Sequence, residues 1–124
     1  MSPLLLVAAL AGGVGAGLRY VVDRLLTPTR GARFPIGIFV VNVSGSFALG
    51  LVTGLGSTVA PELSLVLGLG LLGGYTTFST VSVETVLLAQ RKQWLDAAVN
   101  LFGTLLVAAL AAGLGLVLGS CIAG

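Results

Sequence analysis

The sequence predicts an all-α integral membrane protein with four transmembrane helices in a single domain, residues 1–124. The chain of 124 residues is 56% hydrophobic and only 8% charged, and its mean hydropathy of +1.13 favours a membrane protein over a soluble one. A hydrocarbon core of about 30 Å is crossed by about 20 helical residues, and four apolar segments reach that length. They are residues 3–26, 35–55, 63–90 and 94–119.

Residues 3–26 form the first predicted span rather than a signal peptide. No Lys or Arg precedes the apolar run, and the run is longer than a typical h-region. The glycines between Gly12 and Gly17 indicate close packing, because small residues let membrane helices approach one another. Arg19 lies inside the apolar run, with Asp23 four residues later as an available ion-pair partner. A snorkelling arginine near the end of the span is the simpler interpretation.

The second and fourth spans each carry small or polar residues at every fourth position, which places each set on one helix face. The two sets are Asn42, Ser46, Gly50 and Gly54, and Asn100, Thr104, Ala108 and Ala112. An amide that faces lipid is costly, so Asn42 and Asn100 are expected to face protein or a water-filled passage. Hydrogen bonds between helices would explain both residues without any further function.

The third segment, residues 63–90, is too long for one straight span. Roughly 28 helical residues extend about 42 Å, whereas the hydrocarbon core is about 30 Å thick. The pair Gly73 and Gly74 predicts an interruption near residues 73–77. Irregular backbone at membrane depth must be buried in protein, line a cavity or hold an ion. The interruption is therefore a candidate site.

The distribution of Lys and Arg predicts a single orientation in the membrane. The cations that follow the first or the third span are Arg24, Arg30, Arg33, Arg91 and Lys92. The positive-inside rule places both of these connections in the cytoplasm and both termini outside. An imbalance of this size favours insertion in one orientation only.

The stretch GGYTTFST, residues 73–80, begins a cluster of hydroxyls. Its members are Thr76, Thr77, Ser79, Thr80 and the following Ser82. Some hydroxyls bond to the carbonyl four residues back and need no further explanation, but five within seven residues predict a polar track. Phe78 within the track offers the positive edge of an aromatic ring to an anion. Because the chain has no His and only one cysteine, Cys121, any cation site must use oxygen ligands.

Three motifs, in this order, resemble the Fluc/CrcB family of bacterial fluoride channels: GGVGAGLRY, VNVSGSFALG and GGYTTFST. The resemblance implies a fluoride-selective channel in the bacterial inner membrane, which exports cytoplasmic fluoride passively and relieves its toxicity. It also implies an antiparallel, dual-topology dimer in the lipid bilayer, with two fluoride pathways along the subunit interface. The dimer partner is either a second copy of this chain or an oppositely oriented paralogue.

The resemblance also implies roles for individual residues. The expected ion pathway consists of Asn42, Phe78, Ser79 and Thr80, with Thr104 as the contribution of the fourth span. The carbonyls of Gly73 and Thr76 are expected to hold a structural Na⁺ at the dimer interface. Arg19 is expected at a pore vestibule, where its charge raises the local anion concentration. Glu84 is expected in a wet vestibule near a cation.

Two features depart from the family pattern. The family motif usually continues as T-T-F-S-T-F, and Val81 stands where the second phenylalanine is expected. The one-sided Lys and Arg distribution also conflicts with insertion in both orientations, which an antiparallel homodimer needs. Pairing with a paralogue of opposite orientation explains both features. The alternative is a homodimer that tolerates Val81 and inserts both ways.

Functions of other classes are also compatible with four short spans. A small proton-coupled multidrug exporter needs a membrane-embedded carboxylate, and Glu84 is the only embedded candidate. A purely structural subunit predicts that substitutions of Asn42 and Phe78 leave ion flux unchanged. An enzyme is not expected, because the sequence has neither a nucleophile with its base nor a cluster of metal ligands.

Overall fold

The computed structural model describes residues 3–27 and 34–124, which are almost entirely helical. Within these residues, four helical spans are long and apolar enough to cross a membrane, which confirms the predicted number. The first span is α1 (Pro3–Leu26), and the second is α2 (Ile36–Leu55) with the 3-10 turn η1 (Gly56–Thr58). The third span consists of α3 (Pro61–Leu65), the π-helical η2 (Val66–Leu72), α4 (Gly73–Tyr75) and α5 (Ser79–Gln90). The fourth consists of α6 (Trp94–Ala98), the π-helical η3 (Val99–Gly103) and α7 (Thr104–Ala123).

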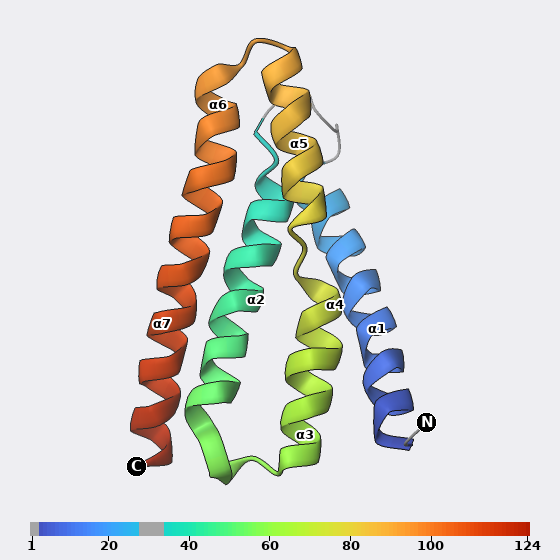
Figure 1. Cartoon of the computed structure of the whole chain (residues 1–124), viewed down its shortest axis with the longest axis vertical. Helices are drawn as coiled ribbons and strands as arrows, with labels where there is room; N and C mark the ends of the chain where they lie inside the picture. Colours follow the sequence, from blue (N-terminus) through green and yellow to red (C-terminus); the bar gives the residue numbers. More distant parts are fainter. Residues whose placement is uncertain (1–2, 28–33) are drawn as a thin grey trace.

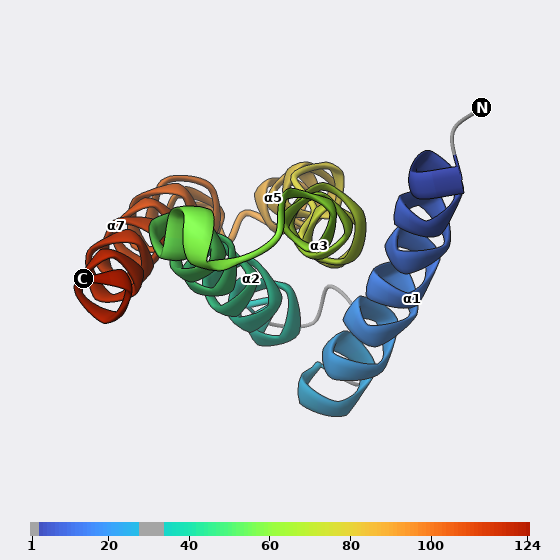
Figure 2. The same ribbon diagram turned by 90° about the horizontal axis from the view of Figure 1, so that it is seen from below.

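The spans alternate in direction and lie side by side. Both chain ends lie at one end of the molecule, and the connection between α5 and α6 lies at the other (Figure 1). Seen from below, α2 lies between α7 and the third span, and α1 lies on the side of the third span away from α7 (Figure 2). Arg24, Arg91 and Lys92 belong to the end opposite the chain termini, as the charge pattern predicts. Arg30 and Arg33 fall outside the described residues.

Residues 76–78 interrupt the third span, between α4 and α5. Thr76 has extended backbone, with φ −79° and ψ 154°. The glycine pair expected to cause the break is itself helical, and Gly73 has φ −61° and ψ −38°. The predicted cause is therefore wrong, and the break lies slightly later in the chain than residues 73–77.

The absence of a side chain at Gly74 allows the third span to contact α1. A Cβ atom at Gly74 would overlap the carbonyl oxygen of Gly12, and one at Gly15 would overlap the carbonyl oxygen of Leu71. The backbones of α1 and the third span therefore touch without intervening side chains, as small residues allow in a membrane. Gly12 and Gly15 of the first motif and Gly74 of the glycine pair therefore serve the same interface.

The second and fourth spans meet in the same way. Cβ atoms at Gly50 and Gly54 would overlap the carbonyls of α7, and a Cβ atom at Gly115 would overlap the carbonyl oxygen of Phe47 on α2. The glycines of the second-span stripe thus pack directly on the fourth span. This contact fixes the position of α7 relative to Asn42, which lies roughly two to three turns before these glycines on α2.

The packing of α2 on α7 predicts a position-specific effect of adding one methyl group. Gly115→Ala is expected to lower the free energy of unfolding by about 1–3 kcal/mol, because overpacking forces the two backbones apart. Gly113→Ala is the matched control, since a Cβ atom there meets nothing within 4 Å. Unfolding in detergent micelles measures both variants, and equal stabilities would contradict this packing.

Candidate functional site

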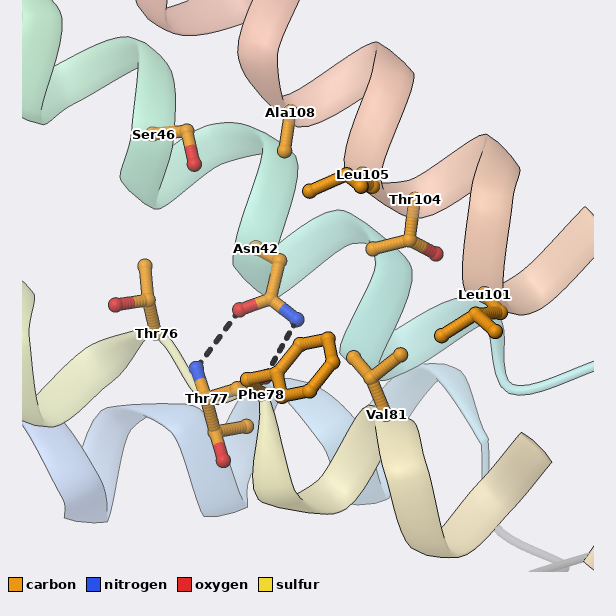
Figure 3. Close-up of a pocket in the computed structure, with 10 residues that line it drawn as sticks. All are labelled: Asn42, Ser46, Thr76, Thr77, Phe78, Val81, Leu101, Thr104, Leu105 and Ala108. Atoms are coloured by element: carbon orange, nitrogen blue, oxygen red, sulfur yellow. Dashed lines mark hydrogen bonds between the residues drawn. The ribbon is translucent and has the colours of Figure 1, made fainter. Parts of the chain in front are cut away.

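A groove of about 240 Å³ opens beside the break in the third span (Figure 3). Its walls come from α2, the break itself, the start of α5, and the η3 and α7 segments. The lining side chains are Asn42, Ser46, Thr76, Thr77, Phe78, Val81, Leu101, Thr104, Leu105 and Ala108. Three residues of the predicted ion pathway, Asn42, Phe78 and Thr104, therefore come together although they lie on three different spans. The lining contains no acidic side chain.

Asn42 holds the break through two hydrogen bonds to a single residue. Its Nδ2 donates to the carbonyl oxygen of Thr77 at 2.8 Å, and its Oδ1 accepts from the backbone N–H of Thr77 at 2.8 Å (Figure 3). A side-chain amide thus takes the place of a helical neighbour for both polar backbone groups of Thr77. Unpaired backbone groups at membrane depth cost several kcal/mol each, so Asn42, which is 7% exposed, is part of the support of the break.

The hydrogen bonds of the break release the carbonyls of Gly73 and Thr76 from helical pairing. In a continuous helix their donors would be the N–H groups of Thr77 and Thr80, four residues later. The N–H of Thr77 donates instead to Asn42, and that of Thr80 donates to Thr77 Oγ1 at 3.4 Å. These two carbonyls are the predicted Na⁺ ligands, and hard cations prefer oxygen donors. The backbone therefore fits an oxygen-liganded cation, and the described residues contain no cluster of three or more acidic or cysteine side chains.

The hydroxyl cluster separates into two groups. Thr76, Ser82 and Thr85 donate to the carbonyl four residues back, as helical hydroxyls commonly do. Thr77 Oγ1 instead lies 3.3 Å from Ser79 Oγ and donates to Thr80 Oγ1 at 3.5 Å. The polar track is therefore shorter than the sequence predicts, and Thr77 is its centre. Thr77 lies two residues before the first residue of α5, and hydroxyl residues just before a helix often bond to its first backbone N–H groups, which is the signal that could have identified it.

A second, smaller pocket of about 180 Å³ includes Thr80 of this track in its lining. Its lining residues are Ala16, Arg19, Tyr20, Asp23, Ile38 and Thr80. Thr77 lines the groove, and its hydroxyl is hydrogen-bonded to that of Thr80. The track thus joins the groove to a pocket lined by Arg19, whereas Ser79 lines neither.

Phe78 and Val81 differ in how they contribute to the groove. Phe78 is 64% exposed and projects at the open side, whereas Val81 is 2% exposed and belongs to the core of the chain. Glu84, expected in a wet vestibule, is only 3% exposed, because it lies on the same inward face of α5 as Val81 and Leu88. The chain itself therefore covers Glu84, contrary to that expectation.

Asn100 connects the fourth span to α5. It is fully buried, and its Nδ2 donates to Thr85 Oγ1 at 2.8 Å and to the carbonyl oxygen of Val81 at 3.2 Å. The sequence indicated only that this amide faces protein, and not that it anchors the helix that carries the polar track. Figure 3 shows that the methyl group of Thr104 points toward Asn42, whereas its hydroxyl points toward Leu101. Thr104 lines the groove as predicted, but its hydroxyl turns away from the centre.

Comparisons with known proteins agree with these motifs. Residues 6–116 match the family model described as "CrcB-like protein, Camphor Resistance (CrcB)". A relative from Leifsonia xyli subsp. xyli, named "Fluoride-specific ion channel FluC 1", is 49% identical over 122 residues, covering 96% of this chain and 89% of the relative. Relatives from Shewanella sp. strain ANA-3 and Shewanella oneidensis, both named "Fluoride-specific ion channel FluC", are 48% and 47% identical over 98 residues, covering 77% of this chain and 79% of each relative.

The two hydrogen bonds of Asn42 predict a loss of stability when the amide is removed. Asn42→Leu is expected to lower the free energy of unfolding by about 1–3 kcal/mol, because both polar backbone groups of Thr77 lose their partner. Hydrogen exchange of the Thr77 amide should accelerate in the same variant. Ser46→Ala is the control, because Ser46 lines the same groove one turn later and makes no hydrogen bond to the break within the described residues. Equal effects of both substitutions would rule out this role.

Proposed function

Because this chain belongs to the CrcB family, we propose that it is a fluoride-selective ion channel that exports cytoplasmic fluoride passively and relieves fluoride toxicity. Relatives that cover most of the chain are named fluoride-specific ion channels. The four membrane spans make the chain a multi-pass membrane protein, which fits the bacterial inner membrane. Its family is one of ion channels, and the chain is not an enzyme.

The groove at the break is the observation that carries the proposal. Fluoride is small and strongly hydrated, so a pathway must replace its water with several hydrogen-bond donors. The groove and its track supply the second N–H of the Asn42 amide, the hydroxyls of Thr77 and Thr80, and the ring edge of Phe78. A lining without carboxylates does not repel an anion. The positive end of α5 also points at the break, which favours negative charge there.

Arg19 and Thr80 fit the entrance of this pathway. The pocket that they share is lined by the cationic Arg19 and by the acidic Asp23. Arg19 therefore offsets an acidic side chain that would otherwise repel anions at this opening. The hydrogen bond between Thr80 and Thr77 then connects this vestibule with the groove. Ser79 extends the track at the exposed surface beside Thr77. Glu84 is assigned no step here, because the chain covers it.

The open side of the groove supports an antiparallel dimer with two pathways along its interface. Phe78 and Leu105 are each 64% exposed at the groove, and an ion pathway that faced lipid on one side would leave the ion without polar contacts. A second subunit in the opposite orientation would close that side. Since the interface repeats by symmetry or pseudo-symmetry, one dimer would contain two grooves.

The carbonyls of Gly73 and Thr76 would hold a structural Na⁺ at the dimer interface. Both lack their helical donors because Asn42 and Thr77 occupy those donors. A bound cation supplies fixed positive charge next to the anion pathway and joins two interrupted spans. The negative end of the half-helix that terminates in α4 points toward the same position.

The proposal favours an oppositely oriented paralogue as the partner over a second copy of this chain. The Lys and Arg distribution favours one orientation. Val81, buried at the groove wall, provides no aromatic edge, and a paralogue could supply it from the other side. The homodimer remains the alternative. No feature of the structure favours the multidrug exporter, which needs an accessible carboxylate in place of the buried Glu84.

Replacement of the Phe78 ring tests the pathway. Phe78→Ile is expected to slow fluoride efflux from proteoliposomes by about tenfold, which corresponds to about 1.4 kcal/mol on the barrier, because the ring edge is lost. Asn42→Ala should slow efflux as well, through both its amide and its support of the break. Phe102→Ile is the matched control, because Phe102 is 67% exposed and lies outside the groove. Unchanged efflux in Phe78→Ile and Asn42→Ala would overturn the assignment.

The choice of partner is tested by reconstituting this chain alone. The paralogue hypothesis predicts that liposomes with only this chain show little fluoride efflux, and that efflux appears on co-expression with an oppositely oriented paralogue. The accessibility of Cys121 to a thiol reagent should then show that the chain is inserted in one orientation only. Rapid, selective efflux from the chain alone, with Cys121 accessible from both sides, would establish the homodimer instead.

A further inference from the structure

Two buried side-chain atoms on the fourth span have no hydrogen-bond partner within the described residues. They are Oδ1 of Asn100 and Oγ1 of Thr104. Asn100 is 0% exposed and Thr104 is 5% exposed, so bulk solvent does not satisfy either atom. Buried polar atoms are nearly always paired, and an unpaired one calls for an unseen partner such as a water molecule. Two such atoms four residues apart on one helix lie on the same face.

The unpaired hydroxyl of Thr104 is an exception among its neighbours. Other helical hydroxyls donate to the carbonyl four residues back; they are Thr53, Thr76, Ser82 and Thr85. The corresponding carbonyl for Thr104 belongs to Asn100, which lies in the π-helical segment η3 (Val99–Gly103). A π-helix pairs residues five apart rather than four. The unpaired hydroxyl thus lies directly after a π-helical turn, and such turns occur frequently at functional sites.

The orientation of the Asn100 amide is determined by its neighbours. Nδ2 donates to the carbonyl oxygen of Val81 and to Thr85 Oγ1, whose own proton goes to the same carbonyl. The reversed amide would set Oδ1 against that carbonyl, so that two acceptors would face each other. Oδ1 must therefore point away from α5. It can accept a proton but donate none.

This arrangement of donors and acceptors selects the ligand. Asn100 Oδ1 needs a donor, while the hydroxyl of Thr104 can donate or accept. Fluoride is an acceptor only, so it would be repelled by Oδ1. A water molecule satisfies both atoms, because it can donate one hydrogen to Oδ1 and accept the proton of Thr104. Figure 3 shows the Thr104 hydroxyl directed toward Leu101, and Asn100 directly precedes Leu101 in the chain.

We propose that one resident water molecule is bound between Asn100 Oδ1 and Thr104 Oγ1, at the groove wall formed by Leu101 and Thr104. This inference rests on the proposed channel function for its role, though not for its location. The bound water has one hydrogen left to donate, and it lies where Leu101 and Leu105 make the wall apolar. It therefore passes the donor capacity of the Thr104 hydroxyl on to the groove through its second hydrogen.

The direct test is a structure that resolves ordered water, determined once in fluoride-free buffer and once with fluoride. Water and fluoride have the same number of electrons, so the two conditions separate them. Density within hydrogen-bonding distance of both atoms in both conditions is the expected result. Density that requires fluoride would show an anion site instead. An empty site, or a side chain of the partner subunit bonded to these atoms, would also overturn the proposal.

Two variants of Thr104 test the role of the water. Thr104→Val preserves the shape of the side chain but removes the hydroxyl, and it should lose the density and slow fluoride efflux several-fold. Thr104→Ser should keep both. Retained density or unchanged efflux in Thr104→Val would contradict the assignment. If the wild-type protein conducted no fluoride, the proposed function would fail, whereas the density would still decide whether the water is present.

Discussion

The structure depends on one interaction, which is the pairing of the Asn42 side chain with the backbone of Thr77. Polar backbone in a membrane must be satisfied within the protein, and this amide satisfies the residue at which the third span ceases to be helical. Since the N–H of Thr77 is taken, the carbonyl of Gly73 is left without its helical donor. A single side chain on α2 thus both supports the break and leaves the carbonyl of Gly73 without its helical donor.

Contacts between glycine backbones place Asn42 where it can make this pairing. The second span packs directly on the fourth through Gly50 and Gly115, and the third packs directly on the first through Gly74 and Gly15. Because no side chains separate these backbones, the helices have little freedom to slide or rotate. The groove beside the break is lined by residues of the second, third and fourth spans, which these backbone contacts help to hold in place.

An unpaired polar group lies at the groove beside a π-helical segment. In the helices of this chain, a threonine hydroxyl often donates to the carbonyl four residues back, as Thr85 does. Thr104, which directly follows η3, has no such bond within the described residues. Because buried polar groups in membrane proteins are rarely left unsatisfied, this hydroxyl indicates a place for a further partner. The anchoring of α5 by Asn100 keeps this region in place.

The sequence by itself determined the number of spans, the interruption of the third span and three of the residues that line the groove, Asn42, Phe78 and Thr104. Hydropathy and length are properties of the chain alone, because the bilayer acts on each segment separately. Only the tertiary structure decided why the break forms and which hydroxyls stay free. Gly73 and Gly74 proved to be helical, Glu84 proved to be covered, and Thr104 turned its hydroxyl away from Asn42. These outcomes depend on which group of a neighbouring span faces each residue. A hydrogen bond forms only at a suitable distance and angle between the two groups, and the spacing of residues in the sequence does not encode that geometry.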